Sequence, residues 1–283
     1  MTKFVAHVSV ADGEQFVQFR RFIALLLMAG TVLAAPAEPP RRVSDLAREQ
    51  RMASEISDAI LDGTPVTLET ADGQGFLGIF TASFVLPVKG TVVILHGRGF
   101  HPDWDDVIHP LRVGLPASGW NTLSIQLPVL EKSARYYDYL AIFDAADSRI
   151  DAAVAEAREH SPVKVIILAH SCGSHMAQHW MHSRGRQGLQ QFDAFVGIGM
   201  GATDYGQPMR EPFALNRIKV PVLDIYAEND FPAVRRLAPQ RRAAMLQGGN
   251  PSNEQMIVED ADHYFVDRGD VLLEAVAIWL DSI

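Results

Sequence analysis

A chain of 283 residues, 48% hydrophobic and 21% charged, has the composition of an ordinary globular protein and is long enough to bury a sizeable core. Its formal net charge of −9, without a run of basic residues, argues against a nucleic-acid partner and against adsorption to anionic membranes by charge. The single cysteine, Cys172, excludes an internal disulfide and any zinc site built from several cysteines.

The first 37 residues have the order of a secretory signal peptide. Arg20 and Arg21 precede an apolar run over residues 22–33, and Ala35-Pro36-Ala37 follows. The run is shorter than the roughly 20 residues that a membrane-spanning helix needs. The pattern predicts cleavage after Ala37, a mature domain over residues 38–283 without a stable membrane span, and a periplasmic or secreted location. An N-terminal anchor or a buried first helix is the alternative interpretation.

A helix and a hairpin are predicted directly after this segment. Apolar residues at near-helical spacing predict a helix over residues 44–61, which Asp62-Gly63 ends. Two strand-like runs, 66–70 and 76–83, are separated by Ala71-Asp72-Gly73, a sequence typical of a hairpin turn.

From residue 91 onward, strand-like and helical segments alternate. The strand-like runs are continuously apolar, as in parallel strands buried on both faces, and cover residues 91–95, 122–125, 163–168, 195–198 and 220–226. The helical segments cover residues 144–159, 173–182, 232–246 and 271–280. This alternation predicts an α/β fold with a doubly wound, mostly parallel sheet of about eight strands. The connection over residues 201–219 is too short for a helical lid domain, so we expect an open site.

The strongest local motif is Ala169-His170-Ser171-Cys172-Gly173, at the end of an apolar strand and the start of a helix. A nucleophile elbow needs small residues two positions before and two after the nucleophile, because strand and helix approach closely there. Ala169 and Gly173 meet that need, although Ala stands where Gly is usual. The motif predicts Ser171 as a nucleophile; a serine in a tight turn with no chemical role is the alternative.

A serine hydroxyl needs a base to take its proton, and in this kind of elbow the partners follow in the order Ser, acid, His. Asp230 follows the strand-like run 220–226, and His263 lies past a short strand and before the last helix. We therefore predict Ser171, Asp230 and His263 as a catalytic triad. Asp204, which follows the preceding strand, is the alternative acid.

A third strand end could supply an oxyanion hole. The run 91–95 ends in His96-Gly97-Arg98-Gly99. Acyl transfer needs backbone N–H donors aimed at the developing oxyanion, and the predicted donors are the amides of Arg98 and Cys172. The alternative is that His96-Gly97 is a turn without this role.

From residue 91 to the C-terminus, the order of His-Gly turn, elbow, acid and histidine resembles the α/β-hydrolase superfamily. Local sequences also resemble an uncharacterised proteobacterial family of exported α/β-hydrolase-like proteins. They include Gly75-Phe76-Leu77, His96-Gly97-Arg98-Gly99 with Trp104, and residues 119–128. The resemblance covers roughly residues 45–283, and it implies the fold and an envelope location without implying a substrate.

Other side chains have weaker functional interpretations. His175, His179 and His182 lie on one face of a predicted helix, but no glutamate of an H-E-x-x-H motif accompanies them, so we expect a polar face and no metal site. Phe100 and Trp104 could shape the mouth of the site. Four arginines are predicted on a solvated helix face: Arg235, Arg236, Arg241 and Arg242.

The sequence as a whole predicts a lid-poor serine hydrolase that needs no cofactor. The preferred activity is that of a carboxylesterase on a small-molecule or lipid-like ester. An acyltransferase or a peptidase could use the same three residues, and a non-catalytic envelope binding or assembly protein could keep the scaffold. The oligomeric state is left open.

Overall fold

The structure is a computed structural model that describes residues 43–160 and 163–283. The signal peptide and its cleavage site lie outside these residues and stay predictions. The strands are β1 (Thr64–Glu69), β2 (Gly75–Thr81), β3 (Gly90–Leu95), β4 (Trp120–Ile125), β5 (Val165–His170), β6 (Ala194–Ile198), β7 (Val222–Asn229) and β8 (Glu254–Asp262). The α-helices are α1 (Leu46–Ala59), α2 (Ile108–Gly114), α3 (Tyr136–Tyr139), α4 (Phe143–His160), α5 (Cys172–Ser183), α6 (Gly185–Gly188), α7 (Pro232–Gly248) and α8 (Gly269–Asp281). None of the helices in these two ranges combines the length and the apolar character that a bilayer crossing requires.

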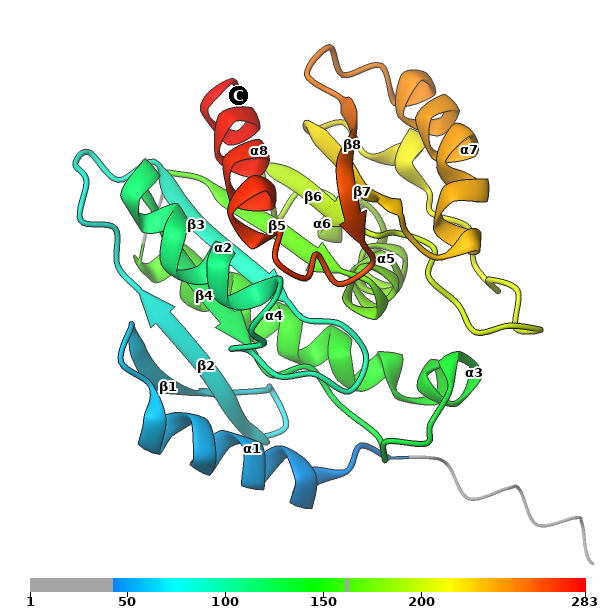
Figure 1. Cartoon of the computed structure of the whole chain (residues 1–283). Coiled ribbons are helices and arrows are strands. Elements are labelled where there is room, and N and C mark those ends of the chain that lie inside the picture. The colour runs from blue at the N-terminus through cyan, green and yellow to red at the C-terminus, as the bar shows by residue number, and fades with distance from the viewer. Residues whose placement is uncertain (1–42, 161–162) are drawn as a thin grey trace, which may run out of the picture. The chain divides into compact units, whose positions relative to one another are not determined.

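The eight strands form one sheet in the order β1-β2-β4-β3-β5-β6-β7-β8 (Figure 1). The hairpin predicted after the first helix is present as β1 and β2, which pair antiparallel, and β2 pairs antiparallel with β4. All pairs from β4 across to β8 are parallel. The carboxyl ends of β3 to β8 therefore meet at one edge of the sheet, where the predicted site residues follow their strands.

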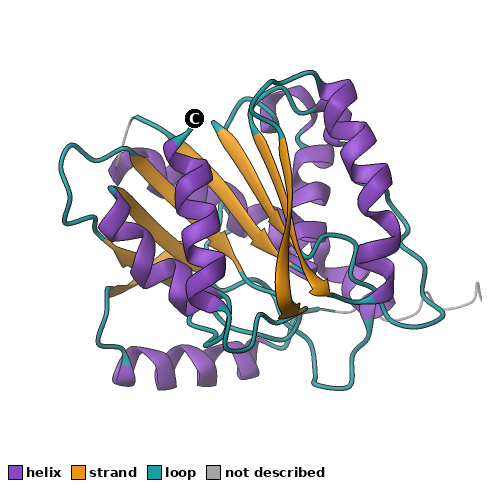
Figure 2. Ribbon diagram, turned by 45° about the horizontal axis from the view of Figure 1, so that its top comes forward, coloured by secondary structure: helices purple, strands orange, loops and turns teal. Residues whose placement is uncertain are grey.

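Helices cover both faces of the sheet (Figures 1 and 2). Successive strand residues point to opposite faces. In β3, Val93 and Leu95 join the core cluster that contains α4 and α5 residues, whereas Val92 and Ile94 join the cluster that contains α2 and α8 residues. All four are fully buried. Burial on both faces is the physical reason that the central strands read as continuous apolar runs.

The connection from β6 to β7 carries no helical lid. Within it the chain forms turns and one short 3₁₀ helix, Leu215–Arg217. Among residues 43–160 and 163–283, loops, and no helical domain, lie at the carboxyl edge of the sheet. The prediction of a fold with little or no lid is therefore confirmed.

The sequence predicts a solvated Arg241, and that prediction is wrong. Arg241 is 4% exposed and its Nε lies 2.8 Å from Oδ2 of Asp224, a fully buried residue of β7. Its Nη1 also donates to the carbonyl oxygens of Met200, at 2.8 Å, and Val234, at 2.9 Å. The guanidinium thus ties α7 to β7 and to the segment after β6.

We expect Arg241→Leu to lower the free energy of unfolding by about 3–5 kcal/mol, because the Asp224 carboxylate then stays buried without its counter-charge. Urea unfolding followed by circular dichroism measures the change. The adjacent Arg242 is exposed, so Arg242→Leu is the matched control and should cost no more than about 0.5 kcal/mol. Equal losses in the two variants would contradict a specific role for the buried pair.

Candidate active site

Ser171 lies in the turn between β5 and α5. Its backbone has φ 53° and ψ −118°, a conformation that costs a non-glycine residue about 1–3 kcal/mol and is held by the surrounding structure. The Ser171 N–H donates to the carbonyl oxygen of Ile198 at 2.8 Å, which fixes the turn against the end of β6. This strained turn presents the side chain at the carboxyl edge of the sheet, as a nucleophile elbow does.

Small residues allow the elbow to close. A Cβ atom at Gly173 would lie 2.6 Å from the carbonyl oxygen of His96 and 2.7 Å from that of Leu95, both backbone atoms that cannot move aside. Ala169 is completely buried in β5, and its methyl group packs in the core on the α4 and α5 side. Glycine is therefore required after the serine, whereas alanine is accommodated before it.

The structure brings together the three side chains that the sequence predicts as a triad. His263 Nε2 lies 2.8 Å from Ser171 Oγ, and His263 Nδ1 lies 2.6 Å from Asp230 Oδ1. The exposed fractions are 9% for Ser171 and 2% each for Asp230 and His263. The Ser171 hydroxyl, the imidazole and the carboxylate thus form a continuous hydrogen-bonded chain that is largely shielded from water.

Backbone donors hold the Asp230 carboxylate in place. Its Oδ1 accepts from the N–H of Phe231 at 2.7 Å, and its Oδ2 accepts from the N–H of Ala227 at 3.3 Å. These two donors fix the orientation of the carboxyl group. The carboxylate therefore faces the Nδ1–H of His263 and leaves Nε2 as the acceptor for the serine proton.

Asp204, the alternative acid, lies elsewhere in the site. Its carboxylate pairs with both terminal nitrogens of Arg98, Nη1 and Nη2, the latter at 3.2 Å from Oδ1, and also accepts from the N–H of Tyr136 at 2.7 Å. Burial alone would raise the pKa of Asp204, but the hydrogen bonds from Arg98 and Tyr136 outweigh it and lower this pKa. Asp204 therefore links the turn after β3, the start of α3 and the segment after β6. The hydrogen-bond partner of His263 Nδ1 is Asp230.

The turn after β3, which carries the predicted oxyanion donor Arg98, is fixed from two sides. His96 Nδ1 donates to the carbonyl oxygen of Gly97 at 2.7 Å, and His96 Nε2 accepts from the N–H of Leu127 at 2.9 Å. Burial lowers the pKa of His96 to about 3, so the ring is neutral. Arg48 of α1 donates to the carbonyl oxygen of Gly99 at 2.8 Å. These contacts hold the turn rigidly beside the elbow.

Cys172, the second predicted oxyanion donor, is the first residue of α5. Its side chain is 5% exposed, and burial raises the pKa of the thiol to about 12. A thiol with this pKa is protonated at neutral pH, so its sulfur is a poor nucleophile. Any chemical role for Cys172 therefore falls to its backbone N–H.

Three residues around His263 were not among those predicted from the sequence. His170 donates from Nε2 to the carbonyl oxygen of His263 at 3.1 Å, and burial lowers the pKa of His170 to about 3. A Cβ at Gly199 would lie 2.9 Å from His263 Cε1, so glycine leaves room for the ring. Phe231 stacks on the imidazole with ring centroids 4.1 Å apart. In the sequence, only their positions could have indicated a place in the site: His170 precedes Ser171, Gly199 follows β6, and Phe231 follows Asp230.

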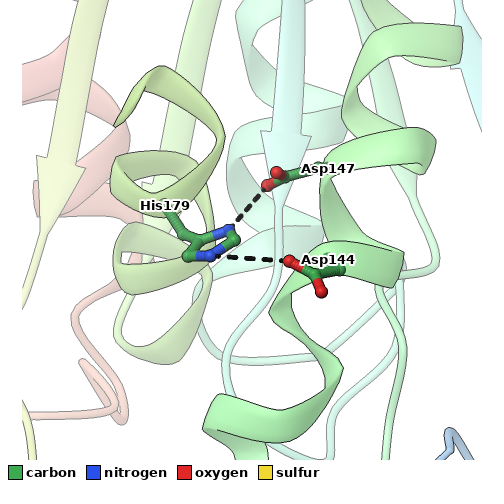
Figure 3. A group of neighbouring side chains, drawn as sticks. All are labelled: Asp144, Asp147 and His179. Carbon is green, nitrogen blue, oxygen red and sulfur yellow. Dashed lines mark hydrogen bonds and ion pairs between the residues drawn. The ribbon is translucent and has the colours of Figure 1, made fainter. Parts of the chain in front are cut away.

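The three helical histidines have separate environments. His175 is buried and its Nε2 donates to the carbonyl oxygen of Ala202 at 3.1 Å, and His182 is exposed. His179 lies between two carboxylates, with Nδ1 3.1 Å from Asp147 and Nε2 3.7 Å from Asp144 (Figure 3). The hydrogen bond that His179 donates to Asp147 raises the pKa of His179. Among the described residues, Asp144, Asp147 and His179 are the one group of side chains placed closely enough to surround a metal ion.

A cleft of about 910 Å³ opens above Ser171 and His263. Arg98 and Asp204 line it together with Cys172, so the predicted nucleophile, base and oxyanion donors face the same space. Phe100 and Trp104 also line it, in agreement with their expected place at the mouth of the site. The cleft is large enough for a small-molecule substrate.

Comparisons with known proteins agree with this architecture. Residues 19–139, less than half of the chain, match a family described as "Protein of unknown function (DUF3530)". None of the curated proteins matches the chain significantly. An esterase from Pyrococcus furiosus is similar in structure, with a TM-score of 0.59 and 16% identity over 87% of this chain and 97% of the esterase.

Two further solved structures have the same arrangement. A dienelactone hydrolase from Anabaena variabilis gives a TM-score of 0.57 at 21% identity, covering 78% of this chain and 97% of its own. A serine hydrolase without a lid from Xanthomonas campestris gives 0.54 at 14% identity, covering 79% and 95%. Sheet order, elbow and these likenesses together show that the chain has the α/β-hydrolase fold.

Proposed function

We propose that the protein is a serine hydrolase, and specifically a carboxylesterase, with Ser171, His263 and Asp230 as its catalytic triad. The observation that carries the proposal is the chain of two hydrogen bonds, 2.8 Å and 2.6 Å long, from Ser171 through His263 to Asp230. The strained elbow and the cleft above it support the same conclusion, because they expose this hydroxyl to a substrate.

The first half of the reaction forms an acyl-enzyme. Ser171 Oγ attacks the ester carbonyl carbon while His263 Nε2 takes the hydroxyl proton, and Asp230 stabilises the imidazolium. The backbone N–H groups of Arg98 and Cys172 donate to the oxyanion of the tetrahedral intermediate. The bond from carbonyl carbon to the alkoxy oxygen then breaks, and His263 returns the proton to the leaving alcohol.

The second half repeats these steps with water as the nucleophile. His263 takes a proton from water, whose oxygen attacks the acyl carbon, and Ser171 leaves with that proton. An alcohol and a carboxylic acid are the products. If another alcohol or an amine replaced water, the same groups would perform acyl transfer, so the nucleophile of this second half separates an esterase from an acyltransferase.

Covalent labelling tests the proposal against a non-catalytic binding role for the same scaffold. A fluorophosphonate probe reacts with a serine only when a base activates it. We expect the wild-type protein to be labelled on Ser171, as peptide mass mapping would show, and to hydrolyse short activated esters. Intact protein that is folded by circular dichroism, yet neither labelled nor active on any ester, would contradict the proposed function and favour the binding role.

A further inference from the structure

The cleft is lined, in the described part of the chain, by aromatic and polar side chains, without large aliphatic ones. Among the described residues that line it there is no leucine, isoleucine, valine or methionine, although 48% of the chain is hydrophobic. Its apolar surface comes from aromatic rings, with alanine, proline and Cys172. A site for a long aliphatic chain would present branched or flexible aliphatic side chains along its length. The composition of this cleft favours a flat ring as the apolar part of a substrate.

The rings of one wall form a continuous series, which we call the aromatic ladder: Trp104, Phe100, Tyr264, Phe231 and His263. Trp104 and Phe100 stack with centroids 3.8 Å apart and planes 10° apart. Phe100 meets Tyr264 edge-on at 5.8 Å, and Tyr264 meets Phe231 edge-on at 6.0 Å. Phe231 stacks on the His263 imidazole at 4.1 Å. All five residues line the cleft.

Apart from the buried His263, the rings of the ladder keep surface exposed beside the cleft. Phe231 is 36% exposed, and Phe100, Trp104 and Tyr264 are only half-buried. Rings that served only the core would be buried, as the core residues Phe195 and Phe265 are, at 1% and 0%. The ladder therefore presents aromatic surface on which a further ring can stack, in the offset or edge-on arrangements that aromatic pairs prefer.

The position of the ladder relates it to one side of the ester. In the proposed reaction, His263 Nε2 gives its proton to the oxygen of the leaving alcohol, so that alcohol departs on the imidazole side of Ser171. The ladder begins at this imidazole, on which Phe231 stacks and which Tyr264 meets edge-on. A group attached to the leaving oxygen consequently comes to lie against the ladder.

We propose that the aromatic ladder binds an aromatic ring on the leaving alcohol, so that the substrate is an ester of an aryl or arylmethyl alcohol. The inference rests on the proposed function and adds the substrate class to it. In this assignment the acyl group lies on the other side of Ser171, away from the ladder.

Two matched pairs of esters test the assignment. Benzyl acetate and cyclohexylmethyl acetate have leaving alcohols of similar size and reactivity, and differ in whether the ring is flat and aromatic. Methyl phenylacetate and methyl cyclohexylacetate place the same difference on the acyl side. We expect kcat/KM to favour benzyl acetate over cyclohexylmethyl acetate by about 2- to 10-fold, the range of one aromatic stacking contact, and a ratio near 1 for the acyl pair.

A variant of the ladder and a matched control complete the test. Phe100→Leu should lower the benzyl ratio toward 1, because it removes one of the rings that the ladder presents to the cleft. Phe84→Leu makes the same substitution at a residue that is 74% exposed in the β2–β3 connection, next to the opposite ends of the strands, and should keep the wild-type ratio. Since each ratio compares two substrates on one protein preparation, partial misfolding of a variant does not alter it.

The outcomes separate this inference from the proposed function. A benzyl ratio near or below 1, a preference that appears only in the acyl pair, or labelling by fluorophosphonate without turnover of benzyl acetate would each overturn the aromatic leaving group while the serine hydrolase stands. Absence of both labelling and turnover of all four esters would overturn the proposed function, and the inference with it.

Discussion

Asp230→Asn should lower turnover of an activated ester by on the order of 10⁴, and Asp204→Asn by only a few-fold. The Asp230 carboxylate accepts the Nδ1–H of His263, and an asparagine amide can donate there and impose the wrong tautomer on the ring. Asp204 Oδ2 accepts from Arg98 Nη1 and from the N–H of Tyr136, and an asparagine oxygen in that position still accepts from both. Steady-state turnover of both purified variants on one ester measures the difference.

The comparison is meaningful only if both variants fold, which thermal unfolding followed by circular dichroism checks. The reverse ranking of the two variants would transfer the role of acid to Asp204. Mild effects in both would show that neither carboxylate orients His263 during turnover, and the triad assignment would then be incomplete.

Ser171→Ala should abolish fluorophosphonate labelling and lower turnover by on the order of 10⁶, because no other described residue presents a hydroxyl to His263 Nε2. Cys172→Ala removes a buried thiol but keeps the backbone N–H that is proposed to donate to the oxyanion. It should therefore be labelled and retain most activity. Peptide mass mapping of the labelled proteins and ester turnover measure both effects.

The adjacent positions make this pair a sharp test of which side chain reacts. Labelling that persists in the Ser171 variant and disappears in the Cys172 variant would make the thiol the nucleophile. That result would require a thiolate at a position where burial raises the thiol pKa to about 12.

Much of the fold follows from patterns that local physics imposes on the sequence. Strands buried on both faces must be apolar throughout, and the elbow must have a small residue at position 173, where a Cβ would meet the carbonyl oxygens of Leu95 and His96. Such requirements can be recognised in a single sequence, because each one restricts the residue types at neighbouring positions. The nine-residue strand β8 lies at the sheet edge and buries only Val258 and Ala261, so it has no continuous apolar run, and only its end was recognised, before His263.

Contacts between residues far apart in the sequence could not be predicted in this way. Four arginines of α7 look alike in the sequence, yet only Arg241 reaches the carboxylate of Asp224, which is hidden within the apolar run of β7. The pairing of Asp204 with Arg98 joins residues 106 positions apart, and no local sequence pattern predicts it. The aromatic ladder likewise gathers rings from three separate loops.

The position of the only thiol has a consequence for the environments in which the protein can work. Oxidants and alkylating agents attack the thiolate, and a thiol pKa of about 12 leaves only about one molecule in 10⁵ ionised at pH 7. With Ser171 as the proposed nucleophile, the chemistry would need no reductant. The reactive group would then stay in the same chemical state in oxidising and in reducing surroundings.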